Sequence, residues 1–184
     1  VIITTRRSVQ DLKNVVEKQI PLLRIQAACD FIRYLATGRP DMAQATNNEL
    51  EPILKITEGN PFLIRLVIKS FLSRSQPLYI ILEDLTKKRA ELGKQVRAYL
   101  FKRSLGEIES KFGVDTSKKL MSAFCARPSG DSFTYDELFK RSRLESEILF
   151  RDVLKLACNL AIIRTYKRNT EYSIHSLLWE FTCG

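Results

Sequence analysis

The sequence has few of the residues that mark disulfide-rich, collagen-like or low-complexity proteins. Among 184 residues there are four cysteines, seven glycines, six prolines and a single histidine. The hydrophobic fraction of 45% is that of an ordinary globular chain, which excludes wholesale disorder. A chain of this length can hold one domain or two small ones, each with a modest buried core.

The cysteines are also far apart in the sequence. They form no C-x-x-C pair, and their spacing predicts neither a zinc site nor a disulfide framework. We therefore expect reduced, mostly buried thiols at all four positions, which are Cys29, Cys125, Cys158 and Cys183.

Long hydrophobic runs are missing as well. The longest apolar stretch, residues 62–72, is interrupted by Arg65 and Lys69, which excludes an ordinary transmembrane helix there. The first residues lack the organisation of a secretory signal peptide. We therefore expect a cytoplasmic protein without a membrane partner.

The motifs of several enzyme classes do not occur. The sequence contains no G-x-x-x-x-G-K-[ST] phosphate loop, and no apolar strand ends in paired carboxylates that could hold magnesium. No G-x-S-x-G nucleophile elbow accompanies the single histidine, His175. We expect no enzymatic activity from this chain alone, and we assign it no catalytic residues and no metal ligands.

Positive charge is in excess: 30 lysines and arginines stand against 21 acidic residues, for a formal net charge of +9. This charge is compatible with nucleic acid, phosphate or an acidic partner surface. A basic cluster over residues 87–103 surrounds one acidic residue, Glu91. It fits a solvated helical face, and it also fits a scaffold that docks an acidic partner or a neighbouring subunit. The members of this cluster are Lys87, Lys88, Arg89, Lys94, Arg97, Lys102 and Arg103.

Apolar residues at helical spacing predict several helices in the first half of the chain. A helix over residues 20–40 ends at a glycine and a proline. A second helix over 47–60 contains Pro52, which is tolerated only within the first turn, and Gly59 suits its left-handed C-terminal cap.

The helix predicted over residues 59–72 has the clearest start signal. Asn60 can cap it, Pro61 fits its first position, and Arg65 and Lys69 lie opposite a wide apolar stripe. Two further helices are predicted over 79–92 and 95–112.

The pattern changes from about residue 95 onward. The predicted elements are a helix that ends at 126–131, helices over 134–142 and 149–159, strands over 160–167 and 171–175, and a final helix over 176–184. In the 149–159 helix, Phe150, Val153, Leu154 and Ala157 share one face. The order helix, helix, helix, hairpin is that of a winged helix.

Three short stretches separated by these helices fall into one pattern. They are VIITTRR at residues 1–7, EGNPFLIRLV at 58–67 and YSIHSLLWEF at 172–181. With the intervening helices and the winged helix, the chain resembles the second half of the nucleotide-binding region of the NB-ARC and STAND family of P-loop signal-transduction ATPases. The resemblance covers nearly the whole chain.

The resemblance implies a mainly α fold, in which a helical bundle is followed by a winged-helix domain with a small β-hairpin. It divides the chain into a terminal strand of an α/β ATPase sheet over residues 1–10, a helical ARC1-like domain over 11–92 and a winged-helix ARC2-like domain over 93–184. In this interpretation the rest of the ATPase sheet precedes Val1, and a sensor region follows Gly184.

The first stretch is similar to the family's sensor strand, which ends at the carboxyl edge of the ATPase sheet. The resemblance implies that Arg6 approaches the terminal phosphate of the nucleotide and that Thr4 or Thr5 joins the network around the phosphates. A guanidinium at a strand end suits a phosphate oxygen because it is planar and always charged. The alternative is that Arg6 and Arg7 only mark a solvated strand end.

The second stretch is similar to the family's G-x-P motif through Gly59 and Pro61. The resemblance implies that the proline packs against the adenine at a helix start. Asn60 and Phe62 stand where plant members have leucines. The same residues are also good helix capping, and Pro61 can serve both purposes.

The third stretch places His175 where the family's M-H-D motif has its histidine, on the β-phosphate of bound ADP. Ile174 replaces the methionine and Ser176 replaces the aspartate. A ring nitrogen near a helix N-terminus can donate to an anion. The alternative is a hydrogen-bonded histidine in the core.

The resemblance thus implies a regulatory, nucleotide-sensing lid that couples the ADP/ATP state to a conformational switch and to homo-oligomerisation. The ligand is ADP or ATP with magnesium, held by an intact parent whose P-loop domain belongs to the same polypeptide. The bare lid is expected to bind nucleotide poorly, because most phosphate contacts come from that domain.

A winged-helix DNA-binding module is the alternative function. Residues 144–157 would be its recognition helix. Glu145 and Glu147 lie at the end of this helix that would meet the bases, where they repel phosphates. The candidate contacts to nucleic acid are Arg151, Lys155, Lys167 and Arg168.

Overall fold

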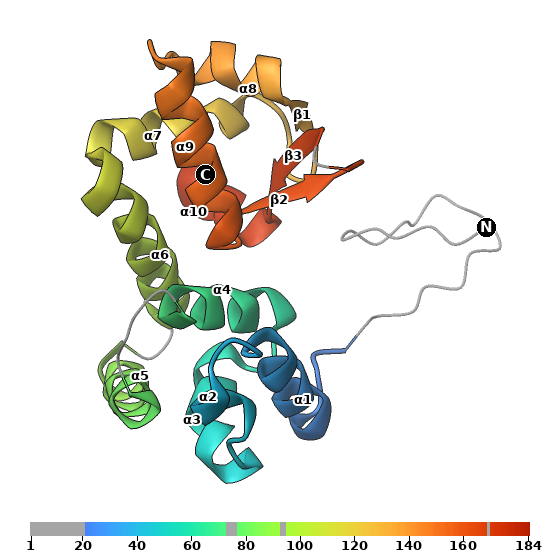
Figure 1. Cartoon of the computed structure of the whole chain (residues 1–184), viewed down its shortest axis with the longest axis vertical. Helices are drawn as coiled ribbons and strands as arrows, with labels where there is room; N and C mark the ends of the chain where they lie inside the picture. The colour runs from blue at the N-terminus through green and yellow to red at the C-terminus, as the bar shows by residue number, and fades with distance from the viewer. Residues whose placement is uncertain (1–20, 73–76, 93–94, 169) are drawn as a thin grey trace, which may run out of the picture.

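The computed structural model describes a mainly helical protein with one small antiparallel sheet (Figure 1). This agrees with the mainly α fold class predicted above. The strand predicted over residues 1–10, which contains Thr4, Thr5 and Arg6, lies outside the described residues. The residues described are 21–72, 77–92, 95–168 and 170–184.

The first half of the chain forms a layer of packed helices. α1 contacts α3 and α4, and α3 also contacts α5. Four residues of the apolar stripe predicted for α4 are buried: Leu63, Ile64, Val67 and Ile68. These helices are α1 (Ile25–Leu35), α2 (Pro40–Ala43), α3 (Asn47–Thr57), α4 (Pro61–Leu72) and α5 (Leu78–Leu92).

The start of α4 is built as the sequence predicts. The side-chain oxygen of Asn60 accepts the backbone N–H groups of Phe62 (3.0 Å) and Leu63 (3.2 Å). Pro61 takes the first helical position, where no N–H is needed. These contacts fix the direction in which α4 leaves the preceding turn.

The expectation that Pro52 lies in the first turn of its helix is wrong. α3 begins at Asn47, after a capping box between Thr46 and Glu49, so that Pro52 falls inside the helix. The missing N–H removes one backbone hydrogen bond. Burial of Leu50 and Ile53 on the same helix offsets this loss.

α6 (Val96–Phe112) joins the two halves of the chain. It contacts α4 in the first half, and α7, α9 and α10 in the second (Figure 1). A buried hydrogen bond of 2.9 Å links the hydroxyls of Ser70 on α4 and Ser104 on α6. Among the described residues, no helix has both the length and the apolar character that crossing a membrane requires.

The second half places helices around a three-stranded antiparallel sheet with strand order β1-β3-β2. The hairpin predicted from the sequence is present as β2 and β3, paired from Ile163 with Ile174 to Tyr166 with Glu171. β1 was not predicted. The elements are α7 (Val114–Ser122), a 3₁₀ turn (Ala123–Ala126), β1 (Phe133–Thr134), α8 (Tyr135–Ser142), α9 (Glu147–Asn159), β2 (Ile163–Tyr166), β3 (Glu171–Ile174) and α10 (Ser176–Cys183).

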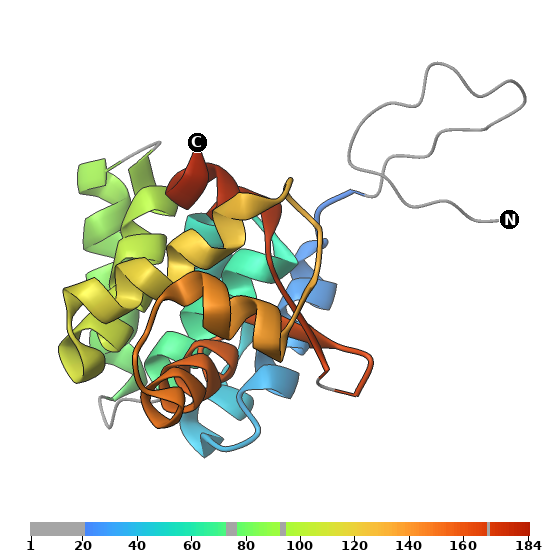
Figure 2. The same ribbon diagram turned by 90° about the horizontal axis from the view of Figure 1, so that it is seen from above.

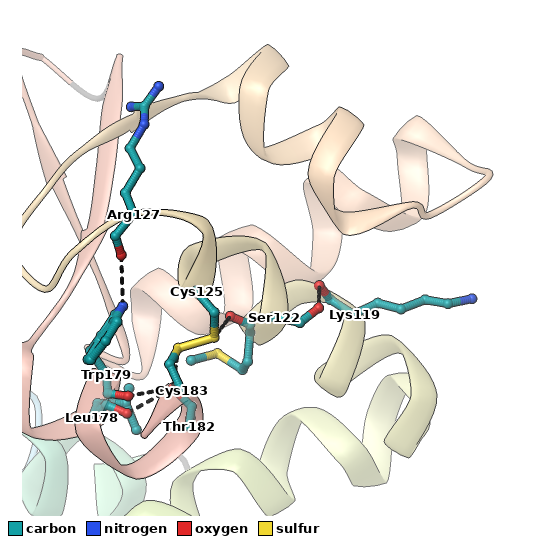
Figure 3. Close-up of a disulfide and its surroundings, with 9 residues drawn as sticks. Lys119, Ser122, Cys125, Arg127, Leu178, Trp179, Thr182 and Cys183 are labelled. Carbon is teal, nitrogen blue, oxygen red and sulfur yellow. Dashed lines mark hydrogen bonds between the residues drawn. A yellow bond between two sulfur atoms is a disulfide. The ribbon is translucent and has the colours of Figure 1, made fainter.

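The prediction of four reduced cysteines is wrong. Cys125, in the 3₁₀ turn, and Cys183, at the end of α10, form a disulfide with their Cα atoms 5.3 Å apart (Figure 3). They are separated by 58 residues, so that only the packing of α10 beside this turn brings them together. Disulfides are rare in cytosolic proteins, and the state of this pair therefore bears directly on the predicted location.

The other two cysteines are free thiols, as predicted. Cys29 is buried in α1, and Cys158 is partly buried in α9. Burial raises the pKa of the Cys158 thiol to about 11. At neutral pH this group is protonated and is a poor nucleophile.

Candidate functional site

Two of the three predicted motif stretches meet in space. The ring of His175 stacks on the ring of Phe62, with centroids 4.0 Å apart and ring planes at 3° to each other. Phe62 belongs to the start of α4, and His175 precedes α10. The GNPF stretch of the first half therefore contacts the YSIH stretch of the second half directly.

Further aromatic rings extend this contact between the halves. Phe62 lies 6.1 Å from Phe101 of α6, and Phe101 lies 5.4 Å from Phe181 of α10, measured between ring centroids. Phe62 and Phe101 are both buried. The four rings form a cluster shared by α4, α6 and α10, and aromatic pairs of this kind are worth roughly 0.5–1.5 kcal/mol each beyond their area burial.

His175 is held in place by its own helix. It is the N-cap residue of α10, and its Nδ1 accepts the backbone N–H of Leu177 at 3.2 Å. Because Nδ1 accepts, we assign the proton of the neutral ring to Nε2. Capping and stacking thus orient this imidazole.

Gly59 and Pro61 occupy different surroundings although only Asn60 separates them. Pro61 lines a cavity between the two halves, whereas Gly59 lines a smaller cavity of about 370 Å³ beside α1 and α3. Gly59 has φ +70°, as its predicted left-handed role requires, and its carbonyl accepts the N–H of Leu23 at 3.1 Å. Gly59 therefore serves chain packing, and Pro61 belongs to the interface between the halves.

The cavity between the halves, called the interlobe cavity below, has a volume of about 790 Å³. It lies between the end of α1, the start of α4 and strand β2. Figures 1 and 2 show the β2–β3 hairpin extending over the side of the molecule that holds α1. Beside Pro61 and Phe62, its wall includes Arg65, Lys69 and Arg164.

Aromatic rings position two of these cations. The Arg65 guanidinium carbon lies 5.8 Å from the centroid of the Phe31 ring, and that of Arg164 lies 5.4 Å from the centroid of the Phe62 ring. Sequence reasoning assigned Arg65 and Lys69 only to the polar face of a helix and did not single out Arg164. The spacing of Arg65 and Lys69 by one helical turn is visible in the sequence. Nothing local to these residues indicates that strand β2 of the second half lies opposite them.

The residues proposed to contact nucleic acid carry mixed charge. Arg151 and Lys155 are exposed on α9, but Arg151 lies 3.8 Å from the carboxylate of Asp152. Lys167 forms an ion pair with Glu171 of the hairpin, whereas Arg168 is exposed in the turn. The structure therefore presents interleaved charges on α9 and the hairpin.

The basic cluster of residues 87–103 is partly neutralised within the molecule. The Arg103 guanidinium lies 2.7 Å from Asp84, and the Lys88 ammonium lies 2.7 Å from Glu91. The hydrogen bond that Lys88 donates to the Glu91 carboxylate raises the pKa of Lys88. Arg97 reaches Glu58 of the first half at 3.1 Å. These pairs favour the solvated helical face over a docking surface.

No protein-family model matches the chain, and a search of curated proteins found no match. The structure brings Pro61, Phe62 and His175 to the interface between the halves and places Gly59 beside Leu23. It adds the three cations Arg65, Lys69 and Arg164, which sequence reasoning did not assign to a site.

Proposed function

We propose that this chain is the regulatory, nucleotide-sensing lid of a STAND-type signalling NTPase. In this proposal it couples the ADP/ATP state to a conformational switch and to oligomerisation, and it hydrolyses nothing itself. A P-loop domain of the same polypeptide holds ADP, or ATP with magnesium. The observation that carries the proposal is the stack of His175 on Phe62, which joins two motif stretches far apart in the sequence.

The topology of the second half supports a winged-helix domain over residues 93–184. A helix, a short strand, two helices and a hairpin follow one another as α7, β1, α8, α9, β2 and β3, with sheet order β1-β3-β2. The helices α1 to α5 then correspond to the ARC1-like domain over residues 11–92. The stack of His175 on Phe62 lies where these two parts meet.

The strength of the contact suits a switch. A single ring stack contributes roughly 0.5–1.5 kcal/mol, which is within the few kcal/mol that separate two conformations of a bistable protein. A nucleotide that contacts both halves would favour their closed packing, and its exchange would release the second half. Such a transition moves between two discrete packings of preformed parts.

The residues around the contact fit an anionic ligand. The interlobe cavity beside Pro61 contains Arg65, Lys69 and Arg164, and no carboxylate is found among the described residues that line it. His175 lies at the N-terminus of α10, where the helix dipole favours negative charge. Bound nucleotide would supply the phosphate charge, while the chain's own role is to orient the imidazole and to hold the two halves together.

The test is His175→Ala in the intact parent polypeptide. We expect ADP retention to fall at least about tenfold, equivalent to 1.4 kcal/mol, and the oligomeric fraction to rise. Release of bound ADP and light scattering after size exclusion measure the two effects. Tyr79→Ala, which removes an exposed aromatic residue of α5, is the matched control.

Two results would contradict the proposal. One is unchanged ADP retention and oligomeric state in His175→Ala. The other is a coding sequence around this chain that specifies no phosphate loop.

A further inference from the structure

The interlobe cavity carries an excess of positive charge that no carboxylate among the described residues of its lining neutralises. Arg65 and Lys69 lie one turn apart on α4, and Arg164 lies on β2 across the cavity. The α4 wall and the β2 wall of the cavity therefore both contribute cationic groups, although they belong to different halves of the molecule.

None of these three cations has a carboxylate within ion-pair distance among residues 21–72, 77–92, 95–168 and 170–184. Other partly buried arginines of the same molecule are paired: Arg103 with Asp84 and Arg127 with Glu137. Like charges that face one concave space raise its positive potential and attract anions. The feature that marks this cavity is thus that three cations line one concave space and no carboxylate lies among the described residues that line it.

The remaining lining suits a small ligand with both ionic and ring-bearing parts. Tyr34 and Tyr166 lie at the cavity and are 72% and 45% exposed. Thr37 and Thr165 add hydroxyl groups to its wall. The volume of about 790 Å³ falls within the range of roughly 300–1,000 Å³ that is typical of small-molecule sites.

We infer that the interlobe cavity binds a di- or triphosphate group, with Arg65 and Lys69 on one side and Arg164 on the other. Guanidinium groups bind phosphate oxygens in a two-pronged geometry, and a lysine adds a compact point charge. A ligand held from both sides ties the β2–β3 hairpin to α4. The inference deepens the proposed function, on which it rests for an anionic ligand at this cavity, but its test needs no P-loop domain.

The phosphate group can come from two sources, an inorganic polyphosphate or a nucleoside phosphate. Tyrosine rings at the cavity favour stacking with a base, whereas the cations act on the phosphates alone. Inorganic pyrophosphate, ADP and adenosine are therefore the three probes. They separate recognition of the phosphates from recognition of the nucleoside.

The experiment is isothermal titration calorimetry of the 184-residue chain at low ionic strength. We expect one pyrophosphate per chain and a binding constant that decreases with added salt. Arg164→Glu should lower the affinity for pyrophosphate at least about tenfold, and Arg65→Glu should do the same. Arg151→Glu makes the same charge change on exposed α9 and is the control, with an expected change below about twofold.

The outcomes separate the sources and test the inference. Equal affinity for pyrophosphate and ADP supports an inorganic polyphosphate, and tighter ADP supports a nucleoside phosphate. A chain that binds neither pyrophosphate nor ADP overturns the inference. Equal weakening of pyrophosphate binding by Arg151→Glu and Arg164→Glu also overturns it. Binding of an acidic peptide but not of pyrophosphate also overturns it and assigns the cavity to a protein partner.

A folding control keeps the result interpretable. Arg164→Gln removes the charge without reversing it and should weaken binding less than Arg164→Glu, while thermal unfolding monitors the structure of each variant. Failure of this experiment leaves the His175 test unaffected, because that test measures ADP held by the intact parent.

Discussion

At the scale of single residues, His175 has two structural roles that are physically separate. Its Nδ1 caps α10 and its ring face stacks on Phe62. The cap is a local contact within two residues, whereas the stack depends on how the two halves pack. A change at this position therefore acts both on α10 and on the contact between the halves.

The backbone at Gly59 leaves no room for a side chain. Its φ of +70° lies in the left-handed region, and an added Cβ would lie 2.6 Å from the carbonyl oxygen of Leu23. We predict that Gly59→Ala lowers the free energy of unfolding by about 1–3 kcal/mol, because it adds left-handed strain to a backbone clash. Urea unfolding followed by circular dichroism measures the loss.

Gly38→Ala is the matched control for this prediction. A Cβ at Gly38 would meet no atom within 4 Å, and its φ lies outside the left-handed region. We expect a change within about 0.5 kcal/mol. Equal losses in the two variants would show that the backbone of Gly59 has no special role.

Among site residues, those with a local signal were predictable and the others were not. Asn60 and Pro61 were assigned correctly as cap and first helical residue, because capping depends on a few adjacent positions. Arg164 was not singled out, because its place at the interlobe cavity depends on α1 and α4. Thr4, Thr5 and Arg6 lie outside the described residues and stay predictions.

At the scale of elements, α10 is held by specific contacts at its start and at its end. His175 caps its start, and the disulfide between Cys125 and Cys183 ties its end to the 3₁₀ turn after α7. Between them, the indole N–H of Trp179 donates to the carbonyl of Arg127 at 3.0 Å (Figure 3). The position of the His175 ring is therefore supported by contacts along the whole helix.

Reduction of the disulfide is predicted to destabilise this arrangement. Closing a loop of this length contributes typically about 2–4 kcal/mol, chiefly by restricting the unfolded chain. For a chain of this size the melting temperature should then fall by roughly 5–15 °C. Scanning calorimetry with and without a dithiol reductant measures the shift.

Cys183→Ser provides the control for the reduction experiment. Its melting temperature should match that of the reduced wild-type chain and should not respond to the reductant. An unchanged melting temperature on reduction of the wild type would show that the bond does not stabilise α10.

The predicted elements were mostly recovered because their signals are local. The 3.6-residue spacing of apolar residues located α1, α4 and α9, and two runs rich in β-forming residues around a polar turn located β2 and β3. β1 has only two residues, which is too short for any periodicity. Pro52 was misplaced because packing of α3 tolerates a helix interior proline that local rules exclude.

At the scale of the whole molecule, α6 couples the halves. It packs against α4 on one side and against α7, α9 and α10 on the other, and its Phe101 joins the aromatic cluster. Any opening of the interface between Phe62 and His175 must therefore also change packing along α6. The proposed switch would therefore change the packing of a whole helix as well as one ring pair.

The net charge of +9 is a property of the whole molecule and predicts weak, non-specific attraction to nucleic acid. We expect binding to a random DNA duplex to be lost as salt rises from about 50 to 200 mM. Arg151→Glu with Lys155→Glu should change this binding by less than about threefold, because carboxylates already lie among these cations on α9. Electrophoretic mobility shifts at several salt concentrations measure it.

The opposite outcome would favour the alternative function. A complex that persists at the upper salt concentration and is abolished by the double variant would identify α9 as a recognition helix. Lys167 and Arg168 of the hairpin turn would then be the next residues to change.

The sequence by itself determined the helices, their caps and the hairpin, because these depend on spacing, turn residues and hydrogen bonds between near neighbours. Only the tertiary structure decided which distant groups meet: the bond between Cys125 and Cys183, the stack of His175 on Phe62, and the three cations of the interlobe cavity. Such contacts depend on the directions in which whole elements pack. No short stretch of sequence specifies those directions, because each results from the sum of many weak contacts across the core.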